Sequence, residues 1–289
     1  MSERTQENFE YCLEQLRKLD RDRYFSCLYA PESKRAALAA LYAYQLELSR
    51  IPHQVKEALP GEIRLQWWVD ALGGEGHGNV RDNPVADALL DAVEHYNLSS
   101  AALATMAEAR RFDLYNDPMP SLNDLEGYCG ETQSLLLQQA VTILVGPEEA
   151  PKFSDACGHG GVVHGMTGLL IALPWHIAGK QQFIPQDTMR RHGLDEVGLF
   201  SGKGSEALEK AAAEIRFHID HHMEKMEAAF SGLPLEGTPA FLPVMLNKQY
   251  LKLLPEFDDG RLQPYEPMSD LSRQWHTWRA SRALTKAFA

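Results

Sequence analysis

Apolar residues recur at helical spacing through most of the chain. Between residues 32 and 51 the apolar positions fall at i, i+4, i+7, i+11 and i+14, and they are Ala37, Leu41, Tyr44, Leu48 and Ile51. This spacing predicts a helix with one apolar stripe. We expect the helix to begin at Pro31 and to end at Pro52, because proline suits a first turn and interrupts a helix interior. A second stripe runs from Leu208 to Phe230.

The same periodicity predicts four further helices, over residues 84–113, 121–145, 154–173 and 269–287. No run of alternating β-branched residues is flanked by turn signals, so the sequence predicts no strand. The Gly- and Pro-rich breaks between the periodic segments have the length of loops and separate no regions of different composition. We therefore expect residues 1–289 to form a single all-α domain.

Composition and charge exclude several classes of function. Of the 289 residues, 40 are acidic and 28 are basic, which gives a net charge of −12. A chain of this charge lacks the basic face of a general nucleic-acid binder. The four cysteines form no C-x-x-C pair, which is typical of reduced thiols. With no apolar signal core and no apolar stretch of about 18 residues, the sequence predicts a cytoplasmic protein.

Five segments resemble the squalene/phytoene synthase family in order and spacing. They are YAPESKRAALAALYAYQLELSR, GEIRLQWWVDAL, RRFDLYNDPMPSLNDLEGYC, GHGGVVHGMTGLLIALPWH and GKQQFIPQDTMRRHGL. The resemblance covers almost the whole chain and implies the isoprenoid synthase fold, a single helical bundle around a deep central cavity. In that family two allylic diphosphates are joined head to head. Two aspartate-rich helices hold Mg²⁺ against the diphosphates, because Mg²⁺ prefers carboxylate oxygens as ligands.

The residues of this chain at those two motifs are not acidic. The resemblance aligns the first motif with Ser49, Arg50 and His53, and the second with Ala172 and His176. Ionisation of an allylic diphosphate requires strong electrostatic stabilisation of the leaving group. The sequence therefore predicts a pseudoenzyme with no catalytic residue and no cofactor. The alternative is a prenyl transferase of isoprenoid biosynthesis with an altered active site, which would still need Mg²⁺.

Within the family, the chain is most similar to the branch that includes the mitochondrial complex I assembly factor 6 and its bacterial relatives. The strings LPGEIRLQWW (Leu59–Trp68) and FDLY (Phe112–Tyr115) carry this similarity. It implies an assembly or accessory factor with a respiratory-complex protein as partner. Such a factor would bind an isoprenoid or another lipid in the former active-site cavity and would be peripheral to the inner membrane.

Several polar residues are candidates for the lining of that cavity. They are Tyr24, Arg35, Tyr44, Arg64, Arg110, Arg111, Asp113 and Tyr250. Arginine and tyrosine side chains can bind the phosphates of an anionic or isoprenoid ligand. The more common alternative is that such residues pair with one another in buried structural networks, for example Asp113 with Arg110 one turn earlier.

Two shorter patterns have structural and functional interpretations. His218 and His222 are one helical turn apart, a spacing that can hold Zn²⁺, but no third ligand is near in sequence, so we expect no native metal site. Gly161, Gly165 and Gly168 form a small-residue stripe. Because glycine costs helix stability, this stripe favours close packing of a neighbouring helix.

The segment 269–289 is basic in an otherwise acidic chain. It contains Arg273, Arg279, Arg282 and Lys286 against one acid, Asp270, and it also contains Trp275 and Trp278. Such a helix can contact an anionic membrane surface peripherally, with tryptophan at the headgroup level. Alternatively, it caps the bundle and its tryptophans complete the core. The sequence leaves both interpretations open.

Overall fold

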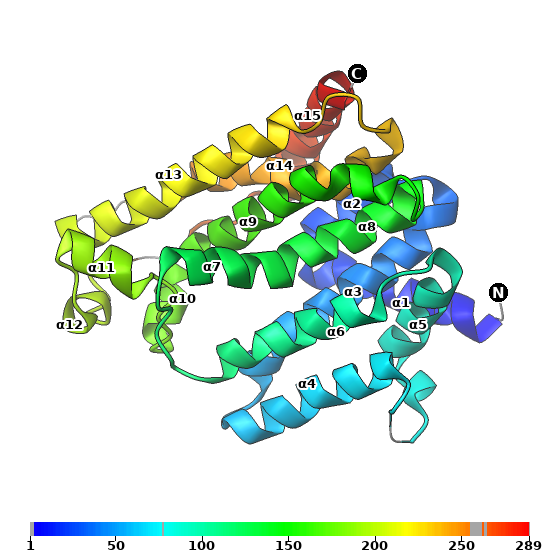
Figure 1. The fold of residues 1–289 in the computed structure, drawn as a ribbon, viewed down its shortest axis with the longest axis horizontal. Helices are drawn as coiled ribbons and strands as arrows, with labels where there is room; N and C mark the ends of the chain where they lie inside the picture. Colours follow the sequence, from blue (N-terminus) through cyan, green and yellow to red (C-terminus); the bar gives the residue numbers. More distant parts are fainter. Residues whose placement is uncertain (1–2, 77, 255–261, 263–264, 289) are drawn as a thin grey trace.

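The computed structural model describes residues 3–76, 78–254, 262 and 265–288, and these residues form a bundle of helices without a β-strand (Figure 1). The N-terminal part contains α1 (Glu3–Leu19), α2 (Arg21–Tyr29), α3 (Glu32–Gln54), α4 (Ala58–Gly73), η1 (Val80–Asp82), α5 (Pro84–Tyr96), α6 (Ser100–Ala109) and η2 (Arg110–Leu114). The remainder contains α7 (Leu122–Cys129), the π-helical turn η3 (Gly130–Ser134), α8 (Leu135–Val145), η4 (Ala150–Phe153), α9 (Ser154–Ile171), α10 (Leu173–Ala178), α11 (Gln186–His192), α12 (Glu196–Leu199), α13 (Glu206–Ala228), η5 (Leu235–Gly237), α14 (Thr238–Tyr250) and α15 (Asp270–Phe288). The all-α prediction is confirmed.

Two predicted helix boundaries are wrong. Helix α3 does not end at Pro52 but continues to Gln54, because a proline near the last turn removes only one helical hydrogen bond. The helix predicted over 84–113 is divided into α5, α6 and η2. Asn97 adopts a left-handed conformation that closes α5, and the Ser99 side chain caps the start of α6 by accepting from the amide of Ala102.

Helix α3 lies at the centre of the N-terminal half and contacts α1, α2, α4, α5 and α8. All residues from Ala37 to Gln45 are buried, so this part of the helix is covered on every side. The segment AALAALYAY is apolar around the whole helix circumference, which is the pattern of a core helix rather than of a surface helix. Beyond Gln45, the exposure of each α3 residue depends on whether a neighbouring helix covers it.

Helix α9 packs against α13 on one side and against the α7–η3–α8 segment on the other. A Cβ atom added at Gly161 would lie 2.2 Å from the backbone nitrogen of Ser134, and one added at Gly165 would lie 2.6 Å from Cys129 Sγ. The Ser134 hydroxyl donates a hydrogen bond to the carbonyl of Gly158 (2.8 Å) across this contact. Close packing is thus confirmed for two glycines of the stripe. At Gly168, a Cβ atom would meet nothing within 4 Å.

Helix α15 packs on α14 and α2 at the C-terminal end of the chain. Its buried face consists of Thr277, Ala280, Leu284 and Phe288, and the Phe288 ring contacts those of Phe153, Phe230 and Phe241. Trp275 and Trp278 stack on each other and are 55% and 48% exposed. The helix therefore caps the bundle, but it does so with Phe288 and not with its tryptophans.

Candidate functional site

A cleft of about 670 Å³ opens between the C-terminal end of α3 and the junction of α9 with α10. Pro52 and His53 line one side, and Ala172, Trp175 and His176 line the other. Three of the positions that the family resemblance assigned to the two acidic motifs, His53, Ala172 and His176, therefore meet at this cleft, whereas Ser49 and Arg50 do not line it. The hydroxyl of Ser49, one turn before His53, donates a hydrogen bond to the carbonyl of Leu46 (2.9 Å).

His176 is a neutral imidazole at pH 7. Burial lowers its pKa to about 4, and the neighbouring His53 acts in the same direction. The ring of His176 packs 4.6 Å from that of Phe183, and its Nδ1 atom has no hydrogen-bond partner among the described residues. His176, which the family resemblance assigned to the second acidic motif, thus presents an uncharged nitrogen base to the cleft.

Two carboxylates, Glu57 and Asp113, line the cleft. Asp113 is already engaged, since it accepts hydrogen bonds from Arg110 Nη1 (3.0 Å) and from the Tyr128 hydroxyl (2.7 Å). The predicted pairing of Asp113 with Arg110 is confirmed, and Tyr128 is a third member that the sequence pattern did not reveal. Within the described ranges, no three His, Cys, Asp or Glu side chains are placed to hold a metal ion.

The other cavity candidates lie away from the cleft. Tyr44 is buried and donates to the carbonyl of Leu103 (2.7 Å), while Arg35 donates to the carbonyls of Ala30 (3.0 Å) and Leu28 (3.2 Å) at the end of α2. Tyr24 is half-buried and packs against the core. Of the candidate set, only Asp113 lines the cleft.

Two further candidates take part in polar contacts between helices. Tyr250 donates its hydroxyl hydrogen to Asp22, which also binds Arg273 of α15. This cluster connects α2, α14 and α15. Arg111 donates to Gln66 Oε1 (2.6 Å) and therefore connects η2 to α4. These contacts fit the structural interpretation of both residues.

Deeper in the bundle, little free space remains between α3, α8, α9 and α14. The void that Tyr42, Leu136, His164 and Val244 help to enclose measures about 10 Å³. A space of this size holds about one water molecule. A ligand that enters the cleft and is larger than a water molecule therefore does not fit into this void.

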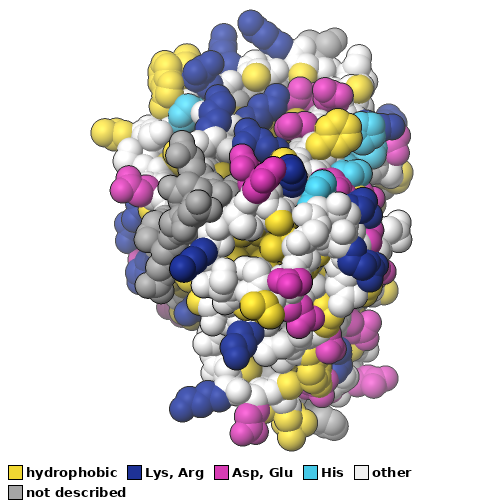
Figure 2. All heavy atoms as spheres, turned by 90° about the vertical axis from the view of Figure 1, so that its left-hand side faces the viewer, with side chains coloured by type: hydrophobic (Ala, Val, Ile, Leu, Met, Phe, Trp, Pro, Cys, Tyr) yellow, Lys and Arg dark blue, Asp and Glu magenta, His cyan; other side chains and the backbone are white. Residues whose placement is uncertain are grey.

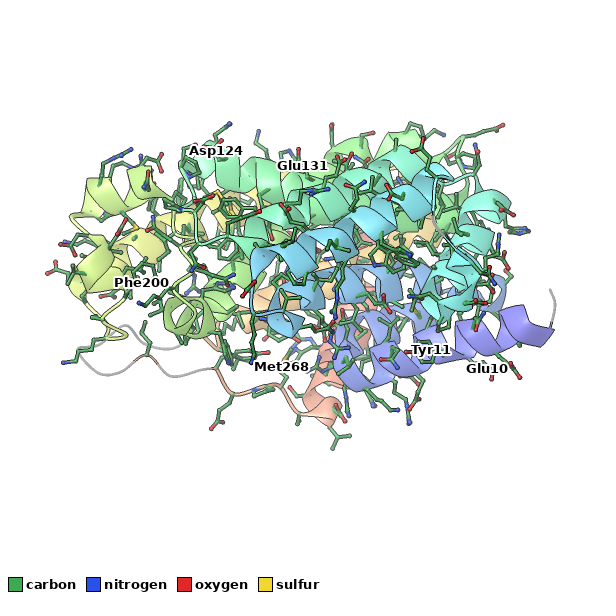
Figure 3. The ribbon with its side chains drawn as sticks, turned by 90° about the horizontal axis from the view of Figure 1, so that it is seen from below. Glu10, Tyr11, Asp124, Glu131, Phe200 and Met268 are labelled. Carbon is green, nitrogen blue, oxygen red and sulfur yellow. The ribbon has the colours of Figure 1, made fainter. Side chains whose placement is uncertain are left out.

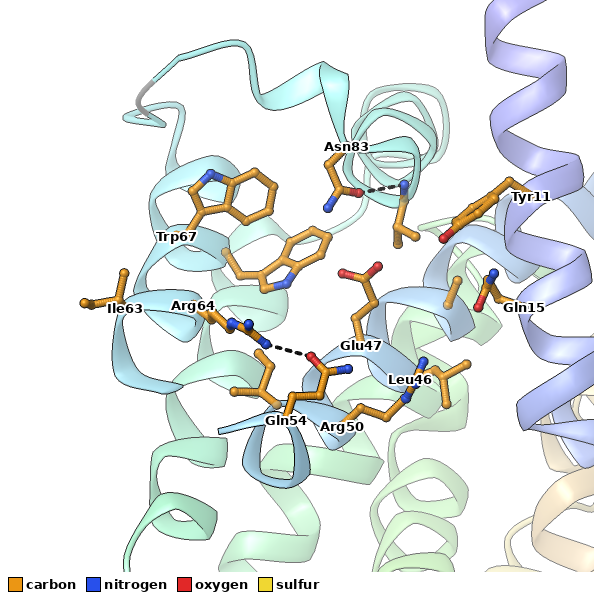
Figure 4. A pocket seen from close by; sticks show the side chains of 14 residues that line it. Tyr11, Gln15, Leu46, Glu47, Arg50, Gln54, Ile63, Arg64, Trp67 and Asn83 are labelled. Atoms are coloured by element: carbon orange, nitrogen blue, oxygen red, sulfur yellow. Dashed lines mark hydrogen bonds between the residues drawn. The ribbon is translucent and has the colours of Figure 1, made fainter. Parts of the chain in front are cut away.

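Arg50 and Arg64 line a second pocket of about 450 Å³, which α1, α3 and α4 help to form (Figure 4). The resemblance grouped Arg50 with Ser49 and His53, but the Arg50 side chain lines this pocket and not the cleft. The sequence pattern also missed Glu47, which lies in the middle of this pocket.

His222 of α13 contacts two neighbouring helices, α9 and α7. His222 Nδ1 lies 2.9 Å from His159 Nδ1, and His222 Nε2 lies 3.4 Å from Glu126 Oε1. Its two nitrogens therefore have separate partners on α9 and α7. Burial lowers the pKa of both His159 and His222. In Figure 2, most of the visible histidine side chains lie close together at the upper right.

All four cysteines are buried as free thiols, one each on α1, α2, α7 and α9. Burial raises the pKa of Cys12 and Cys129 to about 12 and also raises the pKa of Cys27 and Cys157. Thiols of this kind are poor nucleophiles.

Comparisons with known proteins agree with this architecture. The squalene/phytoene synthase profile matches residues 16–271. Complex I assembly factor 6 of Rattus norvegicus is 29% identical over 273 residues, covering 93% of this chain and 81% of the rat protein. The human protein of that name is 28% identical over 254 residues, covering 88% and 76%. A 15-cis-phytoene synthase of Synechocystis sp. is 23% identical over 264 residues, covering 86% and 77%.

Solved structures show the same fold at low sequence identity. A dehydrosqualene synthase in complex with a ligand superposes with a TM-score of 0.84 at 15% identity, covering 98% of each chain. Squalene synthase HpnC from Alicyclobacillus acidocaldarius superposes with a TM-score of 0.72 at 14% identity, covering 87% and 94%. No helix in the described part of the chain is both long enough and apolar enough to cross a membrane. The profile match over most of the chain and the shared helical bundle show that this protein belongs to the squalene/phytoene synthase family.

Proposed function

We propose that this protein is a non-catalytic member of its family that acts as an assembly or accessory factor for a respiratory complex. The observation that carries the proposal is the pair of side chains facing each other across the cleft, His53 and His176. Both are nitrogen donors at positions where the family's reaction needs carboxylates. The names of the rat and human relatives, complex I assembly factor 6, support the accessory role.

The donor set of the cleft does not fit the Mg²⁺ that the family implies. Mg²⁺ takes oxygen ligands in a near-octahedral arrangement, and imidazole is a poor substitute for them. Asp113 is held by Arg110 and Tyr128, which leaves Glu57 as the other carboxylate in the lining of the cleft. One exposed carboxylate cannot neutralise a departing diphosphate.

An isoprenoid or lipid ligand in the cleft remains a prediction. The open part, about 670 Å³, is large enough for a small amphipathic molecule. A long prenyl chain would have to extend toward solvent, because the void deeper in the bundle is about 10 Å³. The cleft is therefore better suited to binding a polar group than to enclosing a prenyl chain.

The absence of turnover can be measured directly. Incubating the full-length protein with farnesyl or geranylgeranyl diphosphate and Mg²⁺ should release no diphosphate above a protein-free blank. The phytoene synthase of Synechocystis serves as the positive control. Mg²⁺-dependent release that Asp113→Asn abolishes would support the alternative, a prenyl transferase with an altered active site.

The accessory role predicts a phenotype in cells of the source organism. Deleting the gene should reduce the amount of assembled NADH:ubiquinone oxidoreductase several-fold, measured on native gels, and expression of the wild-type chain should restore it. Squalene and phytoene levels should be unchanged. An unchanged amount of the assembled complex contradicts the proposed role, and a loss of either isoprenoid product favours the prenyl transferase.

A further inference from the structure

The pocket on the outer side of α3 is separate from the cleft. It is bounded by α1, α3, α4 and the start of α5 and has a volume of about 450 Å³, within the range typical of small-molecule sites (Figure 4). Four residues of its lining, Ile63, Arg64, Trp67 and Trp68, belong to the string LPGEIRLQWW of α4. Part of this string, which does not line the cleft, therefore forms a wall of the pocket.

Glu47 points into the middle of this pocket (Figure 4). The side-chain oxygen of Asn83 caps α5 by accepting from the amides of Val85 (2.9 Å) and Ala86 (3.1 Å), so its amide nitrogen is directed to Glu47. Burial raises the pKa of Glu47, against the opposing effects of Arg50 and Asn83. Ionisation of Glu47 is therefore costly at this half-buried position, and a bound cation would stabilise the carboxylate.

Aromatic side chains stand beside this carboxylate. Trp67 and Trp68 form one wall, with their rings 5.0 Å apart, and Tyr11 forms the other wall with its hydroxyl directed into the pocket. A carboxylate next to aromatic faces favours an organic ammonium group, which gains both an ion pair and cation–π attraction. A primary ammonium can in addition donate hydrogen bonds to Glu47 and to the Tyr11 hydroxyl.

Arg50 and Arg64 bring positive charge to the rim of the same pocket. Both are exposed, whereas Glu47 is half-buried. Arg64 donates to the neutral side chain of Gln54 (2.7 Å), and neither arginine makes an ion pair with a described residue. Arg50 attracts the Glu47 carboxylate electrostatically, Arg64 has a neutral partner, and guanidinium groups at the rim of a pocket suit a phosphate. They also disfavour a ligand that carries only a positive charge.

An apolar strip continues from the rim along α4. Leu59 and Ile63 are one helical turn apart and are 65% and 62% exposed. Ile63 lines the pocket beside Arg64, so the strip begins where a ligand would leave the pocket. Figure 3 shows α1, which carries Tyr11, along the same edge of the molecule as α15 with its exposed tryptophans.

We propose that this pocket binds a 2-aminoethyl phosphate ester, with its ammonium group at Glu47 and Trp67 and its phosphate at Arg50 and Arg64. The ammonium group is the terminal part of such an ester and enters deepest, which matches the burial of Glu47. The glycerol and any acyl chains then lie over Ile63 and Leu59. The same ester group is found in the headgroup of phosphatidylethanolamine and in soluble glycerophosphoethanolamine.

Calorimetry with the full-length protein tests this assignment. Glycerophosphoethanolamine should bind at least tenfold more tightly than glycerol 3-phosphate, which lacks the cation, or ethanolamine, which lacks the anion. If phospholipid is the source, monomeric dihexanoyl phosphatidylethanolamine should bind about tenfold more tightly again, and Ile63→Ser should remove only that gain. Equal affinity for glycerophosphoethanolamine and dihexanoyl phosphatidylethanolamine identifies the soluble molecule as the ligand.

The variant Glu47→Gln separates a binding role from a structural one. It should weaken binding of the zwitterion at least tenfold without weakening that of glycerol 3-phosphate, and its melting temperature should not fall, because a costly buried charge is removed. Glu131→Gln, an exposed position on the opposite edge of the molecule in Figure 3, is the control. The assignment is overturned if the zwitterion binds no more tightly than glycerol 3-phosphate, if it does not bind at millimolar concentration, or if Glu47→Gln retains full affinity.

Discussion

Replacing Gly161 by alanine is expected to lower the free energy of unfolding by about 3 kcal/mol, the largest effect of any single methyl group in α9. The added Cβ would lie 2.2 Å from the backbone nitrogen and 2.4 Å from the Cα of Ser134. Backbone atoms cannot be moved aside by a rotamer change, so α9 and the η3 turn must separate. Urea denaturation followed by circular dichroism measures the loss.

Two alanine variants on the same helix serve as matched controls. Gly168→Ala meets nothing within 4 Å and should stabilise the protein by up to about 1 kcal/mol, because alanine has the higher helix propensity. Gly165→Ala meets mainly the side chain of Cys129 and should fall between the two, since a side chain can shift. Equal effects at Gly161 and Gly168 would show that the close contact with η3 is not formed.

Wild-type protein is expected to co-sediment with anionic vesicles at low ionic strength, and to do so through α15. Trp275 and Trp278 are about half exposed, so they can insert at the headgroup level. Arg273 is bound to Asp22, which leaves Arg279, Arg282 and Lys286 as exposed cations of the helix. At about 1 kcal/mol each, these charges support weak, reversible and salt-sensitive attachment.

Variants of α15 should separate the two contributions. Reversing both charges, Arg279→Glu with Arg282→Glu, should reduce the bound fraction several-fold and remove most of its salt dependence. Replacing Trp275 and Trp278 by serine should reduce binding at every salt concentration. The double variant Arg190→Glu with Arg216→Glu, at exposed positions on α11 and α13, is the control with the same change in net charge. A wild-type protein that stays fully in the supernatant contradicts membrane contact.

The helices that could be predicted from the sequence are those with an uninterrupted apolar stripe, such as α13 and α15. The periodicity does not reveal α14, because Pro243 lies inside this helix, where a proline usually interrupts the helical pattern. Burial of α14 against α2, α9 and α15 outweighs the hydrogen bond lost at Pro243. Tertiary packing of this kind leaves no periodic signal in the segment itself.

The candidate site could be predicted in part. The family resemblance grouped His53, Ala172 and His176, which do line one cleft, because it aligned whole segments on both sides of that cleft. Residues chosen by type alone, such as Tyr44 and Arg35, lie elsewhere, since the direction of a side chain depends on the rotation of its helix. Glu47 was missed for the same reason: its importance comes from Asn83 and Trp67, which are distant in sequence.

The burial of the four thiols gives the chain an internal set of probes for local unfolding. Each cysteine belongs to a different helix, and each can be alkylated only when that helix separates from its neighbours. The rate of labelling at Cys12 then reports the opening of α1, the rate at Cys129 reports the opening of the α7–α9 contact, and the rate at Cys157 reports the opening of the start of α9. If the N-terminal helices open independently of the rest, Cys12 will be modified under conditions in which Cys157 is still protected.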